Sequence, residues 1–279
     1  MKTFISLAII LLVFVFFLPN LISTEIGNRL LNLILEKKTG IQIESASLSW
    51  TGPQIFSGLS YIKEKKRVTA KELKIQNREF NLKNLDIWLV GHHISGDQIS
   101  LSIEGDYSIP LFSFSFEKVQ IPNMTLKLGK MVWQNFGAVR DLLSILQLKI
   151  PTDADIPLWF QDSPASITNG ILHFERTEVL LDNTYEFAIW NNIDLTKKEF
   201  NLTLGIPQST IQKVLDIRGI PKDFTIPMRL TGPFNNPSLH KSTALKTVAT
   251  LLLLQKLPLA PLPKVKASPP ARRPFPWNQ

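Results

Sequence analysis

Hydrophobic and polar residues alternate along most of the chain from Gly40 onward. The pattern is clearest in residues 97–119, where the turn-like GDYSIP separates two alternating runs. The apolar positions of these runs are Ile99, Leu101 and Ile103, then Phe112, Phe114 and Phe116. Successive side chains of a β-strand point to opposite faces, so each run predicts a strand with one apolar and one polar face.

Further runs of this kind predict about a dozen strands between residues 41 and 230. They lie at residues 41–50, 68–75, 80–89, 99–103, 111–116, 124–132, 167–174, 179–181, 187–190, 200–206 and 224–230. Helical spacing is confined to four segments, at residues 23–39, 136–146, 209–217 and 242–257. These patterns predict a mainly β, largely antiparallel fold behind an N-terminal transmembrane helix. Such few helices can cover only part of that sheet.

The amino terminus carries a nearly uninterrupted apolar run at residues 4–18. Its length is at the short end of the roughly 17–25 residues that cross a membrane. No small-residue cleavage motif follows it, so residues 1–22 are interpreted as an uncleaved signal anchor, with a cleavable signal peptide as the alternative. The amphipathic segment 23–39 either contacts the membrane or packs on the first strands.

The rest of the chain divides into a β-domain, a helix and a tail. The β-domain covers residues 40–241 and the helix covers residues 242–257. Residues 258–279 contain seven prolines and no periodicity, which is typical of an extended, disordered tail. The chain has a net charge of +8, and half of this excess lies in the tail. Because no basic run is interleaved with aromatic residues, a nucleic-acid partner is not expected.

The composition leaves little room for catalysis. The chain has no cysteine and four histidines, none at a metal-binding spacing. Asp153 and Asp155 are the nearest approach to a paired-carboxylate site, and acids before a proline are more typical of a solvated loop. No phosphate-binding, dinucleotide or nucleophile motif is present. We therefore expect a protein that is not an enzyme and has no cofactor and no metal.

Two segments resemble the AsmA-like proteins of double-membraned bacteria. One is KKTGIQIESASLSWTGPQIFSGLSY at residues 37–61, directly behind the apolar run. The other is residues 188–240, where a strand pair around NNIDLTKKEFNLTLGIP is followed by IPMRLTGPFNNP. The resemblance implies an inner-membrane, single-pass anchor and a periplasmic body built as a curled β-sheet with an apolar interior. It also implies a role in lipid transport between membranes or in outer-membrane biogenesis.

This chain is much shorter than family members that bridge the periplasm. About a dozen strands at roughly 4.8 Å each span only about 60 Å. The protein would therefore act as a short shuttle, multimerise end to end, or dock on a partner through its Pro-rich tail.

The apolar faces can pack on one another in a closed core or line an open groove that holds hydrocarbon, and periodicity does not choose between them. In the second case the partners are the inner membrane and phospholipid acyl chains, with other envelope proteins bound through the tail. The alternative is an anchored, non-enzymatic scaffold or assembly factor for envelope or secretion components, with a closed β core. The candidate groove lining is Ile99, Leu101, Ile103, Phe112, Phe114, Phe116, Leu126, Leu128, Leu202 and Leu204.

Overall fold

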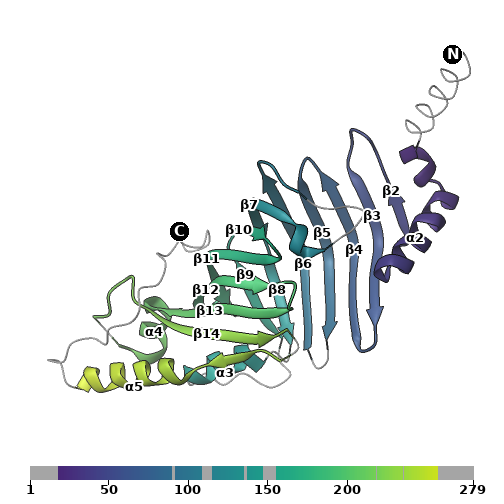
Figure 1. The fold of residues 1–279 in the computed structure, drawn as a ribbon. Coiled ribbons are helices and arrows are strands. Elements are labelled where there is room, and N and C mark those ends of the chain that lie inside the picture. The colour runs from purple at the N-terminus through teal and green to yellow at the C-terminus, as the bar shows by residue number, and fades with distance from the viewer. Residues whose placement is uncertain are drawn as a thin grey trace, which may run out of the picture. The chain divides into compact units, whose positions relative to one another are not determined.

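The fold is mainly β, with antiparallel strands and few helices, in a computed structural model (Figure 1). The structure describes residues 18–89, 92–108, 115–134, 137–146, 155–217, 219–234 and 236–256. The described part of the chain contains no helix with the length and apolar character needed to cross a membrane. Almost all of the predicted anchor, and the Pro-rich tail at residues 258–279, lie outside the described residues.

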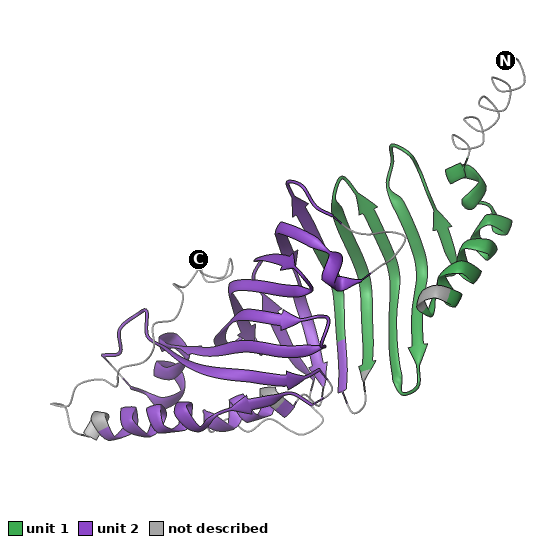
Figure 2. Ribbon diagram, viewed as in Figure 1, with its two compact units in different colours: residues 1–90, 95–100 green, residues 91–94, 101–279 purple. Residues whose placement is uncertain are grey.

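The chain forms two compact units (Figure 2). Unit 1 comprises residues 1–90 and 95–100, and unit 2 comprises residues 91–94 and 101–279. Strand β6 (His92–Glu104) contributes residues to both units.

Unit 1 is a sheet of long hairpins. Its described strands are β1 (Ile41–Gln42), β2 (Ser45–Ser47), β3 (Gln54–Lys63), β4 (Lys66–Gln76) and β5 (Glu79–Leu89). They pair in the order β1-β3-β4-β5, and β2 also pairs with β3. Asn77 and Arg78 connect β4 to β5 and both have positive φ, as a type I′ hairpin turn requires.

The alternation of apolar residues shifts by one position at the same level of three neighbouring strands. The strand registers place Gly58, Lys71 and Asn84 side by side on β3, β4 and β5. Around this row the flanking apolar residues are three positions apart instead of two: Phe56 and Leu59, Ala70 and Leu73, Leu82 and Leu85. Gly58 and Asn84 have positive φ, which interrupts the regular pleat where the pattern changes phase.

Helix α2 (Glu25–Thr39) begins at the N-cap Thr24 and packs along β1 and β2 (Figure 1). It matches the amphipathic segment predicted at residues 23–39. Among the described residues of unit 1, the buried apolar side chains are Ile43, Ala46 and Ala70, with Pro19 before the helix. Unit 1 therefore has very little hydrophobic core of its own.

The described residues of unit 2 include nine further strands and three α-helices. The pairing order is β7-β10-β11-β12-β13-β14-β15, while β8 and β9 pair with each other and β9 pairs with β11. The strands are β7 (Gln120–Lys127), β8 (Gly129–Gln134), β9 (Ile156–Phe160), β10 (Ser163–Thr168), β11 (Ile171–Leu181), β12 (Tyr185–Asp194), β13 (Glu199–Pro207), β14 (Thr225–Pro233) and β15 (Ser238–His240). The helices are α3 (Gly137–Ile145), α4 (Gln208–Leu215) and α5 (Ser242–Lys256).

Unit 2 contains a large cluster of buried apolar residues. The register pairs Leu202 with Leu230 and Ile206 with Ile226, so apolar residues of β13 and β14 share one face of the sheet. Buried residues of the helices join the same cluster: Leu142 and Leu143 of α3, Ile211 of α4, and Ala244, Val248 and Leu251 of α5. In this unit, the helices complete the apolar layer.

Some predicted strands differ from the observed ones. The run at residues 111–116 was expected to be a strand, but its described end belongs to the 3₁₀ helix η1 (Phe116–Lys118), which makes that part of the prediction wrong. The run at residues 124–132 is divided between β7 and β8, because Leu128 lies between them outside both strands. Turn residues set where these strands end. Because they leave the apolar pattern almost unchanged, the pattern alone does not locate the ends.

Candidate functional site

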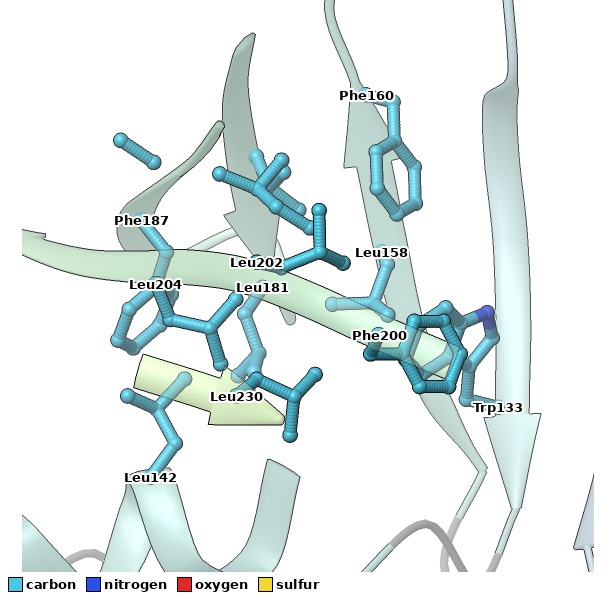
Figure 3. Close-up of a pocket in the computed structure, with 13 residues that line it drawn as sticks. Trp133, Leu142, Leu158, Phe160, Leu181, Phe187, Phe200, Leu202, Leu204 and Leu230 are labelled. Carbon is cyan, nitrogen blue, oxygen red and sulfur yellow. The ribbon is translucent and has the colours of Figure 1, made fainter. Parts of the chain in front are cut away.

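An apolar pocket lies inside unit 2, between α3 and the strands β8, β9 and β11–β14 (Figure 3). Figure 3 shows side chains from these elements converging on a common space. The lining consists of Trp133, Leu142, Leu158, Phe160, Val179, Leu181, Phe187, Ala188, Ile189, Phe200, Leu202, Leu204 and Leu230.

Strand register brings this lining together. Val179 of β11 pairs with Phe187 of β12 and with Phe160 of β9, so one level of the sheet is apolar across three strands. Ile189 pairs with Leu204 on the next strand. Because residues two apart on a strand share a face, a single phase of alternation on each strand is enough to build an apolar wall.

The pocket is small and has no titratable side chain. Its volume is about 90 Å³. A water molecule occupies roughly 30 Å³ of the liquid, so the pocket has room for about three groups of that size, such as the last methylenes of an acyl chain. An all-apolar lining can exclude water and contact hydrocarbon, and it offers no group for proton transfer or metal binding.

Two of the ten candidate lining residues, Leu202 and Leu204, lie in this pocket. Ile99, Leu101 and Ile103 lie on β6, and the structure does not bring them into the pocket. Leu126 and Leu128 are half-buried near the end of β7 and are also elsewhere. Phe116 is exposed on η1, while Phe112 and Phe114 lie outside the described residues.

Sequence reasoning missed most of the pocket. On β9 the lining residues Leu158 and Phe160 are separated by Trp159, which is also apolar, so the segment shows no alternation of polar and apolar residues. Leu142 belongs to α3, and its position over the strands depends on tertiary packing. The signal that could have been used is the pair of alternating runs around Phe187 and Ile189 and around Leu202 and Leu204, which were identified as strands but not placed side by side.

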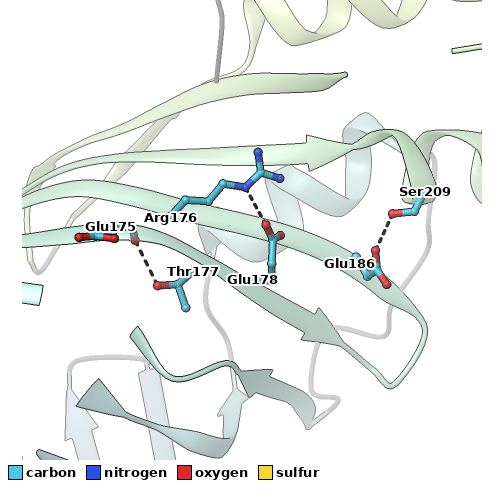
Figure 4. Close-up of polar contacts among 6 residues, drawn as sticks. All are labelled: Glu175, Arg176, Thr177, Glu178, Glu186 and Ser209. Carbon is cyan, nitrogen blue, oxygen red and sulfur yellow. Dashed lines mark hydrogen bonds and ion pairs between the residues drawn. The ribbon is translucent and has the colours of Figure 1, made fainter. Parts of the chain in front are cut away.

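The opposite face of β11 carries a buried ion pair (Figure 4). The Arg176 Nε donates to a Glu178 carboxylate oxygen at 2.6 Å, and the guanidinium lies over the Trp190 ring at 5.9 Å. Arg176 is 4% exposed and Glu178 is 8% exposed. Burial raises the pKa of the Glu178 carboxyl above its usual value, and the hydrogen bond from Arg176 opposes this rise.

This pair lies among further polar contacts on β11 and β12. Thr177 donates to the backbone oxygen of Glu175, and Ser209 of α4 donates to the Glu186 carboxylate at 2.6 Å (Figure 4). The Glu186 charge contributes to the raised pKa of Glu178. The Ser209 contact connects the start of α4 to β12.

Asp153 and Asp155, the candidate paired carboxylates, are not seen together in the described residues. Asp153 lies outside them, and Asp155 accepts a hydrogen bond from Gln134, whose side-chain oxygen lies 3.1 Å from His93 Nδ1. Within the described ranges, no cluster of three or more potential metal ligands occurs.

Comparisons with protein-family models, with curated proteins and with solved structures find no match for this chain. The resemblance to AsmA-like proteins therefore stays a prediction based on residues 37–61 and 188–240.

Proposed function

We propose that this protein is a membrane-anchored, non-enzymatic lipid-handling protein of the AsmA-like kind, with its body in the periplasm. The observation that carries the proposal is the pocket of unit 2, whose lining residues are all apolar. The apolar run at residues 4–18 supplies the expected inner-membrane anchor. Phospholipid acyl chains are the expected ligands, and the role is lipid transport between membranes or outer-membrane biogenesis.

The size of the pocket suits exchange better than storage. Burial of a methylene stabilises a complex by about 0.8 kcal/mol, so about three methylenes contribute roughly 2 kcal/mol. A lipid held this weakly would leave readily. The sequence allowed an open groove for acyl chains. The site in this proposal is smaller and binds only the end of an acyl chain.

Because a weakly held lipid is lost during purification, the test exposes the purified full chain to vesicles that contain a photoreactive phospholipid, and mass spectrometry then measures the cross-linked lipid. Leu204→Phe adds volume inside the pocket, whereas Leu172→Phe makes the same change on β11 outside its lining. We expect cross-linked phospholipid at more than trace stoichiometry in the wild type and in Leu172→Phe, and a several-fold lower amount in Leu204→Phe. Thermal unfolding of both variants confirms that the fold is retained.

A wild type consistently free of cross-linked lipid, or equal cross-linking in all three proteins, would contradict this proposal. The first result would favour the second candidate, an anchored scaffold or assembly factor with a closed core. The buried cluster of unit 2, which includes residues of α3, α4 and α5, supports that alternative. Its own test is deletion of residues 258–279, which should then abolish co-purification of envelope proteins.

A further inference from the structure

Helix α2 presents an apolar stripe to solvent. Ile26, Leu30, Leu33 and Ile34 lie at helical spacing on one side of the helix, and each is more than half exposed. Soluble proteins normally bury such a stripe against their own core. Here, the structure describes no part of unit 1 that covers it.

The opposite side of α2 contacts the first strands. Asn32 Oδ1 accepts a hydrogen bond from the backbone N–H of Ile43 at 3.0 Å, and Asn28 Oδ1 accepts one from Ala46. Just before the helix, Ser23 Oγ accepts a hydrogen bond from the Leu48 N–H at 2.9 Å. These contacts hold the side of α2 that carries Asn28 and Asn32 against the first strands, so the apolar stripe faces away from the sheet of unit 1.

A tight turn precedes the helix. The Ser23 N–H donates to the Pro19 carbonyl at 3.0 Å, and Thr24 caps the start of α2. A Cβ on Gly27 would lie 2.1 Å from the Leu21 carbonyl oxygen, so only glycine allows the segment before the turn to pack this closely on α2. The chain therefore changes direction between Pro19 and Glu25.

We propose that α2 lies in the plane of a phospholipid bilayer surface, with its apolar stripe at the boundary between headgroups and acyl chains. The apolar run at residues 4–18 lies immediately upstream, so the same stretch of chain delivers both the anchor and the stripe to the membrane. Lys37 is exposed one helical turn after Leu33 and suits anionic headgroups, whereas Arg29 is already paired with Glu25. This inference rests on the membrane anchoring of the proposed function and does not depend on the pocket of unit 2.

If α2 lies on the bilayer, the first strands of unit 1 are held close to the bilayer surface. The hydrogen bonds that Ser23, Asn28 and Asn32 accept couple the α2 region to the backbone of residues 43–48. A bilayer that holds α2 would hold this sheet edge at the lipid surface as well.

The absence of cysteine from the sequence allows a direct test with single spin labels. Leu30→Cys and Leu33→Cys place labels on the stripe, and Lys65→Cys places one at the exposed turn between β3 and β4. The labelled full chain is reconstituted in vesicles of phosphatidylcholine and phosphatidylglycerol. Collision rates with oxygen, which partitions into lipid, and with a water-soluble nickel complex report the depth of each label.

We expect the labels at positions 30 and 33 to collide more with oxygen than with nickel, and the label at position 65 to show the reverse. Nickel-dominated collisions at positions 30 and 33 would overturn the inference. Low collision rates with both reagents would also overturn it, because they would assign the stripe to a protein contact, such as a second copy of the chain. The lipid content of the pocket is measured separately, so either proposal can fail while the other stands.

Discussion

Both units contain strands with one apolar face, but they differ in how much of that face is buried. Among the described residues, unit 1 buries only the apolar side chains of Pro19, Ile43, Ala46 and Ala70. Unit 2 buries a large cluster that extends from Leu142 to Leu251. Hydrophobic alternation identifies the two faces of a strand, but it does not specify what will cover the apolar one.

The helices account for much of this difference. In unit 2, α3, α4 and α5 contribute apolar residues to the core. In unit 1, α2 turns asparagine side chains toward the strands and leaves its apolar stripe exposed. An amphipathic helix therefore predicts an interface without indicating which of its sides the protein itself will use.

The largest expected effect comes from placing a charge in the core of unit 2. Ile226 is fully buried on β14, and Ile62 is 65% exposed on β3. Ile226→Asp should lower the free energy of unfolding by more than about 4 kcal/mol, because the carboxylate has no polar partner there. Ile62→Asp should change it by less than about 0.5 kcal/mol. Urea unfolding followed by circular dichroism measures both, and equal losses would remove the distinction between the units.

The buried ion pair gives the next largest effect. Arg176→Met should cost about 3 kcal/mol or more, because it leaves the Glu178 carboxylate buried without its cation. Arg229→Met, at an exposed position on β14, should cost less than about 0.5 kcal/mol. Chemical denaturation at neutral pH compares the two, and a nearly neutral Arg176→Met would show that this face is better hydrated than the structure indicates.

The Arg176–Glu178 pair also predicts that the free energy of unfolding depends on pH. The pKa of Glu178 is raised in the folded protein, so between the unfolded and folded pKa values the native state binds more protons. Its contribution to stability is therefore present at low pH and is lost as the pH rises above about 4.5 through the folded pKa. Glu178→Gln should remove this part of the pH profile, while Glu175→Gln at the exposed neighbouring position should keep it. Identical profiles for the two variants would count against the raised pKa.

A smaller effect on stability is expected at the row of Gly58, Lys71 and Asn84, where the apolar alternation of unit 1 shifts by one position. Asn84 has a φ of 49°, a conformation that β-branched residues adopt poorly. Asn84→Val should cost about 1–2 kcal/mol, whereas Asn84→Gly should be nearly neutral. Asn81→Val, on the same strand at a position without positive φ, serves as the control. A fully tolerated Asn84→Val would mean that the phase shift does not need this conformation.

The smallest effect concerns the hydrogen bonds between α2 and the first strands. Asn32→Ala removes the acceptor of the Ile43 N–H and should cost about 1 kcal/mol. Amide hydrogen exchange at Ile43 should become faster, while Asn32→Asp should preserve most of the protection because it keeps an acceptor oxygen. Unchanged exchange in Asn32→Ala would indicate that α2 is not held to the strands by this contact.

The sequence predicted the β class, the antiparallel arrangement and the approximate positions of all four helical segments. These features depend on local periodicity, which Leu202 and Leu204 on β13, and Leu142 on α3, display clearly. The predicted helix at residues 242–257 corresponds closely to α5, which begins at Ser242 and ends at Lys256.

The pocket and the ion pair could not be predicted in the same way. Phe160 and Phe187 reach one space because β9 and β12 both pair with β11, and that partnership is long-range. Arg176 and Glu178 are two residues apart, which is unremarkable on a strand, and only the burial of this face makes them a close pair. Both features depend on how the strands pair and on which elements bury each face of the sheet. A single sequence carries only weak signals for either.

The side chains with which α2 meets the first strands also limit how this protein can assemble. Open sheet edges invite strand addition from other chains, because their backbone groups are unpaired. Here the N–H groups of Ile43, Ala46 and Leu48 already donate to side chains of the α2 region. A neighbouring copy would have to displace those side chains before it could add a strand at this edge. Filament growth through the first strands is therefore opposed by the chain itself, and any end-to-end assembly would have to use a different edge.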